Sequence, residues 1–74
     1  MLRFAGERLH AIRVQAGMTQ YALMKACDLG LASVTRWENN ITTPNLIEVY
    51  KIARFFKVPM EYFVIDGDKD TKNK

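Results

Sequence analysis

Residues 19–40 read TQYALMKACDLGLASVTRWENN, and this stretch determines the expected fold more than any other part of the chain. Thr19 is suited to cap a helix that lasts to about Cys27. Asp28-Leu29-Gly30 then forms a turn, and a second helix runs from Leu31 to Asn39. Asn40 tolerates the left-handed conformation in which the chain leaves that helix. Two short helices joined by a tight turn are therefore expected, with the second on the outside of a small domain.

Helical spacing of apolar residues continues on both sides of this stretch. It predicts a first helix over Phe4–Ala16. Asn45 followed by Glu48 has the spacing of a capping box, which begins a fourth helix that ends near Phe56. A short fifth helix is expected over Met60–Ile65. Because no run alternates apolar and polar residues, no strand is expected, and the fold class is all-α, a compact five-helix domain.

The composition fits one small domain. The chain has 74 residues, of which 49% are hydrophobic, and this content argues against overall disorder. We expect a domain over residues 1–65 and a polar, disordered tail over residues 66–74. The net charge of +3 favours polyanionic partners without identifying them. One cysteine and the lack of a long apolar stretch favour a reducing, cytoplasmic setting with no membrane contact.

The helix expected over residues 31–39 divides its side chains between two faces. Val34 and Trp37 point inward, with Glu38 beside them. The outward face carries Ala32, Thr35, Arg36 and Asn39. An outward helix of this kind can enter the major groove of DNA.

Arg36 is the strongest candidate for reading a base. Its guanidinium can donate two parallel hydrogen bonds to O6 and N7 of guanine. The alternatives are a solvated surface arginine and one that holds a phosphate without reading sequence. Leu31 and Ala32 cannot hydrogen-bond through their side chains, so their expected role is apolar contact with thymine methyl groups. For Leu31, packing against the preceding helix is an equal alternative.

Short polar side chains around this helix are suited to hold DNA phosphates, which sets register rather than sequence. Gln20 lies in the first turn of its helix, where its side chain and unpaired backbone N–H groups can share a phosphate. An ordinary glutamine at a helix start is the alternative. The other candidates are Ser33, Thr35, Asn39, Thr42 and Thr43.

Arg13 and Glu38 are expected to form a structural ion pair. Arg13 lies next to the buried stripe of the first helix and Glu38 flanks Trp37, so a bidentate pair would fasten the two helices together. Two independent surface charges are the alternative. His10 and Cys27 do not have the spacing of metal ligands, and no catalytic set is present, so no metal, no cofactor and no enzymatic activity are expected.

From Glu7 to Val64 the chain resembles the Cro/repressor-type helix-turn-helix family of bacterial and phage regulators, the XRE family. Met18-Thr19-Gln20 corresponds to the L-T-Q of that family, and residues 35–39 (TRWEN) correspond to its S-R-W-E-N. The resemblance implies a five-helix domain that binds operator DNA as a homodimer, with the helix over residues 31–39 in the major groove. It also implies base-reading roles for Leu31, Ala32 and Arg36, and phosphate contacts by Gln20, Arg13 and Asn39.

The chain departs from the family pattern at three places. Asp28 replaces the usual turn glycine, and Met24 replaces an alanine where two helices approach closely. The loop over residues 40–43, which often carries Lys or Arg in this family, is uncharged. Fewer phosphate contacts weaken binding and flatten its salt dependence, so reliance on dimerisation is expected.

Surplus apolar side chains predict a homodimer. The fourth helix is expected to bury Leu46, Val49, Ile52, Ala53 and Phe56. The side chains left over for a symmetric patch are Ile47, Tyr50, Phe55, Tyr62, Val64 and Ile65. Alternatively, some of these tuck under the tail or the N-terminus.

The leading functional hypothesis is a sequence-specific DNA-binding transcriptional regulator, a repressor that recognises a palindromic operator. The compact Cro-like repressor, the restriction-modification controller and the antitoxin that binds a toxin are all compatible with it. The alternative is a protein-interaction module that kept the fold and lost most or all DNA binding.

Overall fold

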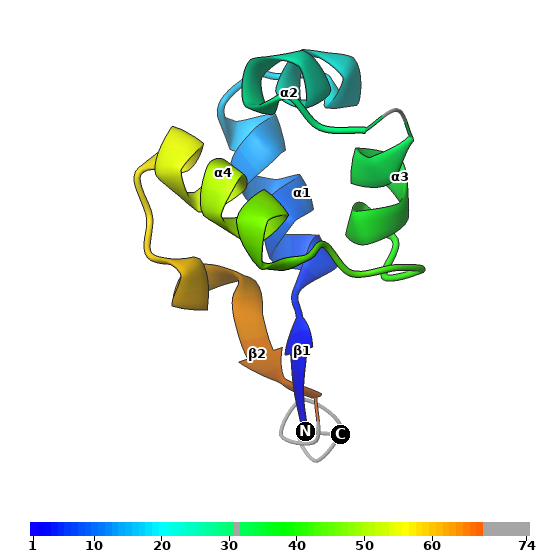
Figure 1. The fold of residues 1–74 in the computed structure, drawn as a ribbon, viewed down its shortest axis with the longest axis vertical. Coiled ribbons are helices and arrows are strands. Elements are labelled where there is room, and N and C mark those ends of the chain that lie inside the picture. The colour runs from blue at the N-terminus through cyan, green and yellow to red at the C-terminus, as the bar shows by residue number, and fades with distance from the viewer. Residues whose placement is uncertain (31, 68–74) are drawn as a thin grey trace.

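The computed structural model describes residues 1–30 and 32–67, and in this part of the chain four α-helices enclose a small core (Figure 1). The helices are α1 (Gly6–Gln15), α2 (Gln20–Cys27), α3 (Ser33–Glu38) and α4 (Leu46–Phe56). They are accompanied by a 3₁₀ helix, η1 (Met60–Phe63), and by two strands, β1 (Leu2–Phe4) and β2 (Val64–Asp66). None of the described helices is long and apolar enough to cross a membrane.

Local side-chain chemistry sets the helix boundaries. Thr19 Oγ1 accepts the backbone N–H of Ala22 at 3.0 Å and caps α2, as predicted. Asp28 ends the same helix in the left-handed region, with φ of 54°. At the start of α4, Asn45 and Glu48 each accept the other's backbone N–H, so the predicted capping box is formed.

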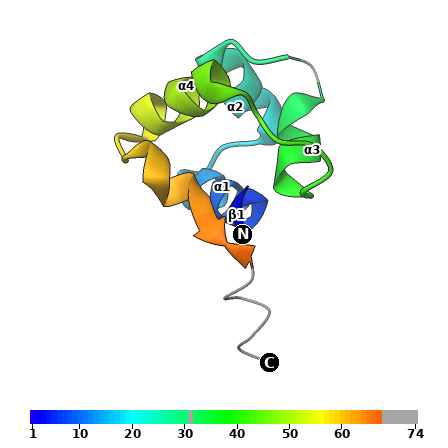
Figure 2. The same ribbon diagram turned by 60° about the horizontal axis from the view of Figure 1, so that its bottom comes forward.

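The core holds α3 at one side of the helical body. Its largest fully buried side chains are Leu9, Leu23, Ile52 and Phe63. Val34 and Trp37 of α3 pack into this core and are 2% and 3% exposed. In Figures 1 and 2, α3 lies across the molecule from η1 and from the C-terminal end of α4. One face of α3 is therefore fixed, and the other faces solvent.

The expectation of no strand was wrong. β1 and β2 pair antiparallel, with Leu2 opposite Asp66 and Phe4 opposite Val64. Each strand has three residues and its partner lies at the other end of the domain, so no local alternation could indicate the pairing. Asp66, expected to open the tail, is part of this sheet. The rest of the predicted tail, residues 68–74, lies outside the described residues.

Three predicted helices are shorter than expected. The first runs over Gly6–Gln15 instead of Phe4–Ala16, because Phe4 belongs to β1. The last one is a 3₁₀ helix over Met60–Phe63, because Val64 has extended backbone and pairs with Phe4. The described fold therefore contains four α-helices and one 3₁₀ helix instead of five helices of one kind. The helix expected over residues 31–39 begins at Ser33, because Ala32 before it has a φ of 69°.

Candidate nucleic-acid interface

The outer face of α3 presents polar side chains to solvent. Thr35, Arg36 and Asn39 are exposed, opposite the buried Val34 and Trp37. Arg36 makes no side-chain hydrogen bond or ion pair with any described residue. Its guanidinium is therefore available to a ligand, and its geometry matches the two acceptors on the major-groove edge of guanine.

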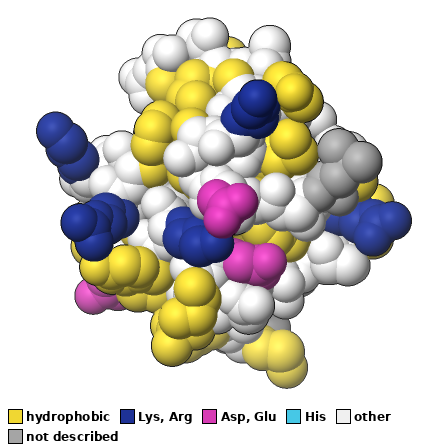
Figure 3. Space-filling view, turned by 45° about the horizontal axis from the view of Figure 1, so that its top comes forward, with side chains coloured by type: hydrophobic (Ala, Val, Ile, Leu, Met, Phe, Trp, Pro, Cys, Tyr) yellow, Lys and Arg dark blue, Asp and Glu magenta, His cyan; other side chains and the backbone are white. Residues whose placement is uncertain are grey.

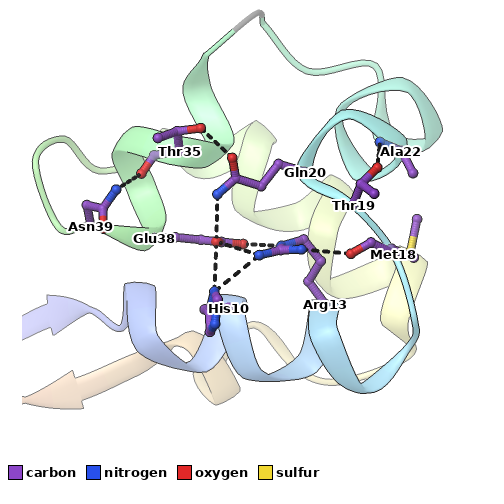
Figure 4. Close-up of polar contacts among 9 residues, drawn as sticks. All are labelled: His10, Arg13, Met18, Thr19, Gln20, Ala22, Thr35, Glu38 and Asn39. Atoms are coloured by element: carbon purple, nitrogen blue, oxygen red, sulfur yellow. Dashed lines mark hydrogen bonds and ion pairs between the residues drawn. The ribbon is translucent and has the colours of Figure 1, made fainter.

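A buried ion pair fastens α3 to α1 (Figure 4). Arg13 Nε donates to Glu38 Oε2 at 2.6 Å and Arg13 Nη2 donates to Oε1 at 3.0 Å, the bidentate arrangement expected from the sequence. The side chains of Arg13 and Glu38 are 10% and 4% exposed. Arg13 Nη1 also donates to the carbonyl oxygen of Met18 at 2.7 Å. Arg13 thus joins α1, α3 and the segment that leads into α2.

This placement favours the structural role of Arg13 over the expected contact with a DNA phosphate. All three of its guanidinium nitrogens already have acceptors within the protein, and its side chain is buried. Displacing Glu38 from this pair would leave its carboxylate buried without its partner, which is strongly unfavourable. Arg13 is a structural residue.

Glu38 is surrounded by hydrogen-bond donors. Besides Arg13, Gln20 Nε2 donates to Glu38 Oε1 at 3.0 Å, and His10 Nδ1 lies 3.1 Å from the same oxygen. Burial by itself raises the pKa of Glu38, but the hydrogen bonds from Arg13, Gln20 and His10 outweigh it and hold the pKa below its ordinary value. Glu38 is therefore a charged anchor inside the domain.

Gln20 connects this buried network to the outer face of α3. Its Nε2 donates to Glu38, and its Oε1 accepts the hydroxyl of Thr35 at 2.6 Å. Asn39 Nδ2 in turn donates to the carbonyl oxygen of Thr35 at 2.9 Å. Figure 4 shows the glutamine side chain extending from α2 between Glu38 and Thr35. The structure therefore brings together Gln20, Thr35 and Asn39, three of the predicted phosphate ligands.

The remaining predicted DNA-binding residues flank this cluster. Ser33 is half-buried in the first turn of α3, and Ala32 beside it is exposed. Thr42 and Thr43 are exposed in the segment between α3 and α4. Leu31, the third predicted base-reading residue, lies outside the described residues.

A second polar cluster, which the sequence did not predict, ties the C-terminal end of α3 to α1. Asn40, with φ of 59°, accepts the backbone N–H of Gly6 through Oδ1 at 3.2 Å and donates through Nδ2 to Glu7 at 3.4 Å. Arg3 forms two hydrogen bonds to Glu7, at 3.1 and 2.7 Å, and they are the main cause that lowers the pKa of Glu7 to about 2. Within this cluster, the four-residue spacing of Arg3 and Glu7 is the contact that the local sequence could have indicated. The contact between Asn40 and Gly6 joins residues 34 positions apart, so no local pattern could have predicted it.

The structure brings part of the predicted dimer patch together on α4. The exposed members are Ile47, Tyr50, Phe55 and Val64, and the half-buried ones are Tyr62 and Ile65. Tyr50 and Ile47 line an apolar hollow of about 330 Å³ together with Leu46 and Met60. Tyr50 lines a second hollow with Phe55. Leu46, expected to be buried, is 71% exposed because it occupies the first turn of α4, beyond the core.

Charged and apolar side chains are mixed on the face of the molecule shown in Figure 3. Figure 3 shows hydrophobic side chains interspersed with Lys, Arg, Asp and Glu on one face, with no single block of positive charge. Within the described ranges, no group of three or more His, Cys, Asp or Glu could hold a metal ion. Cys27 is 7% exposed, and burial raises the pKa of its thiol.

Comparison with known proteins places this geometry in a family. The model of the helix-turn-helix family matches residues 9–63. The HTH-type transcriptional regulator PrpR of Mycobacterium tuberculosis is 38% identical over an alignment of 68 residues, which covers 88% of this chain and 13% of that protein. The chain thus spans a small part of the length of this relative.

A solved structure has the same fold. The P22 c2 repressor protein, crystallised in complex with synthetic operator 9T in the presence of Tl⁺, superposes with a TM-score of 0.76. Sequence identity is 24%, over 82% of this chain and 92% of that one. From the family model, which matches most of the chain, we conclude that this chain belongs to the Cro/repressor-type helix-turn-helix family.

Proposed function

We propose that this domain is a sequence-specific DNA-binding transcriptional regulator that places α3 in the major groove of its operator. The observation that carries the proposal is the exposed Arg36, which has no partner among the described residues, on a helix whose other face is fixed by Trp37 and Glu38. A rigid helix with one uncommitted guanidinium is suited to read a base. The family is one of DNA-binding regulators rather than enzymes, so catalysis is not proposed.

We propose individual roles for the side chains on and around α3. Arg36 reads a guanine, and Ala32 contacts a thymine methyl group beside it; for Leu31 the same contact remains an expectation from the sequence. The phosphate ligands are Gln20, Ser33, Thr35, Asn39, Thr42 and Thr43. Because none of these six carries a charge, binding should depend less on salt than in proteins that use many Lys or Arg contacts.

We also propose that the protein acts as a homodimeric, cytoplasmic repressor. The exposed Ile47, Tyr50 and Phe55 on α4 supply apolar surface for a two-fold contact. Such symmetry would place two α3 helices about 34 Å apart, so the operator would be a palindrome with half-sites one turn apart. Sedimentation equilibrium tests this step. A monomer at high micromolar concentration, both alone and on DNA, would exclude the dimer.

One experiment tests the DNA-binding function directly. The protein is used to select DNA duplexes from a random pool, and its affinity for the most enriched duplex is measured over a range of salt concentrations. We expect a palindromic consensus and a shallow salt dependence. A matched control is Lys57→Asn, which also removes one positive charge but lies after α4, in the left-handed region that asparagine tolerates. Arg36→Ala should lose the consensus while Lys57→Asn retains it.

A second candidate function is a protein-interaction module, for example an antitoxin that binds its toxin. The apolar hollow lined by Leu46, Ile47, Tyr50 and Met60 favours it, because such a surface can receive a partner's side chains. The absence of any enriched duplex in the selection would favour this function over the regulator.

A further inference from the structure

An open hollow separates α2 from α3 on the side where Gln20 bridges them. Its volume is about 260 Å³. The side chains that line it include Gln20, Tyr21, Met24, Ala32, Val34 and Thr35. The long side chain of Met24, at the position where the resemblance leads one to expect alanine, forms part of the wall.

The lining is mostly apolar, and the side chains of Gln20 and Thr35 are engaged with each other. Val34 is 2% exposed, and Tyr21, which is 62% exposed, forms a large apolar wall at the rim. The polar atoms of Gln20 and Thr35 are hydrogen-bonded to each other at 2.6 Å. No Lys, Arg or His is among the described residues that line the hollow, so no positive charge in its wall draws a phosphate into it. It is suited to a small apolar group.

The hollow adjoins the face of α3 that the proposed function directs at DNA. Thr35 lines it and is the neighbour of Arg36, and Ala32 borders it at the start of α3. Lys25 lies with its Nζ 5.7 Å from the centre of the Tyr21 ring, which places a positive charge beside the rim. A DNA backbone attracted there would bring base edges next to the hollow.

Among the groups that base pairs present in the major groove, one is apolar, the C5-methyl group of a pyrimidine. We propose that the hollow between α2 and α3 receives the C5-methyl group of one pyrimidine in each half-site, with Tyr21 and Met24 as its specificity-determining walls. Met24 is unbranched and polarizable, so it can close around the methyl group. This inference rests on the proposed DNA-binding function. The methyl group belongs either to thymine or to 5-methylcytosine.

The test removes or adds single methyl groups in the selected operator. Each thymine is replaced in turn by deoxyuridine, and each cytosine by 5-methylcytosine. If thymine is the source, a single deoxyuridine in one half-site weakens binding about fourfold, the effect of exposing one buried methyl group. If 5-methylcytosine is the source, one methylated cytosine strengthens binding by a similar factor.

The methyl effect must also depend on the hollow. In Tyr21→Ser and Met24→Ala it should fall below twofold. Tyr21 is exposed, so the first variant is expected to fold even if the second is less stable. Val14→Ser is the matched control, because Val14 is an exposed apolar residue of α1 that does not line the hollow; it should keep the full methyl effect.

The possible failures are distinguishable. A selected operator that depends on Arg36 but shows no methyl effect, or a methyl effect equal in all variants, would overturn the inference and leave the proposed function standing. If no duplex is selected at all, the proposed function and this inference both fail.

Discussion

Arg36 and Glu38 lie in the same turn of α3 and face opposite environments. Arg36 is exposed and unpaired among the described residues. Glu38 is buried and accepts hydrogen bonds from Arg13 and Gln20, and His10 Nδ1 lies 3.1 Å from its Oε1. The contrast separates two tasks. Glu38 fixes the helix, and Arg36 is left to act on a ligand.

Removing Glu38 should strongly destabilise the domain. Glu38→Ala leaves the guanidinium of Arg13 buried without a counter-charge, and such losses cost about 3–5 kcal/mol. Urea unfolding followed by circular dichroism measures the change. Glu61→Gln, an exposed carboxylate in η1, is the control and should change stability by less than about 0.5 kcal/mol. Equal stability of the two variants would show that the ion pair contributes nothing.

Ala32 offers a stabilising substitution. Its φ of 69° is a conformation that costs an L-residue about 1 kcal/mol and a glycine little. We therefore expect Ala32→Gly to raise the melting temperature. Ala26→Gly, at an exposed position inside α2, should lower the melting temperature, because the difference in helix propensity costs about 1 kcal/mol of stability. A loss of stability in both variants would argue against the left-handed conformation at Ala32.

At the scale of the elements, α1 and α3 touch where Gly6 meets the end of α3. A Cβ at Gly6 would collide with the carbonyl oxygen of Trp37, and a backbone atom cannot move aside as a flexible side chain can. Gly6 also donates its N–H to Asn40. The position therefore requires glycine because of close approach.

Gly6→Ala should cost about 1–3 kcal/mol by forcing the two helices apart. The control is Gly67→Ala, where the new Cβ would lie 3.5 Å from Arg3 in ordinary contact. Thermal unfolding of both variants checks the prediction. If Gly6→Ala melts at the same temperature as Gly67→Ala, the close approach of α1 and α3 is not as described.

The elements that could be predicted are those with local signals. Thr19, Asn45 and Glu48 cap their own helices, and the chemistry of a cap lies within four residues. The strands could not be predicted, because Leu2 and Asp66 have no neighbours in sequence that indicate their pairing. The contacts of the candidate site divide in the same way. The Arg13–Glu38 pair could be predicted from the faces on which the two residues lie in their helices. The hydrogen bond between Gln20 and Thr35 could not be predicted, because it depends on how closely α2 and α3 approach each other.

At the scale of the whole molecule, the carboxylates predict how stability depends on pH. Arg3 lowers the pKa of Glu7 from 4.5 to about 2, and the pKa of Glu38 is also lowered. A carboxyl group whose pKa is lower in the folded protein than in the unfolded chain stabilises the fold at pH values above its unfolded-state pKa. This stabilisation is lost as the pH falls through its folded-state pKa. We expect the urea midpoint to be level near neutral pH and to fall between about pH 4.5 and pH 2.

A variant can assign this acid sensitivity. Glu7→Gln with Glu38→Gln should have a lower midpoint at pH 7 and a flatter profile below pH 4.5. If the double variant and the unmodified protein lose stability in parallel as the pH falls, other groups are responsible.

The central claim is that Arg36 on α3 reads a base in a specific operator. The most direct measurement is the affinity for the selected operator divided by the affinity for a random duplex of equal length at the same salt concentration. For the unmodified protein we predict a ratio of about 10³ or more. Arg36→Ala should lower it about 10- to 100-fold while Lys57→Asn leaves it unchanged. A ratio near one for the unmodified protein, or an equal ratio in Arg36→Ala, would contradict the account.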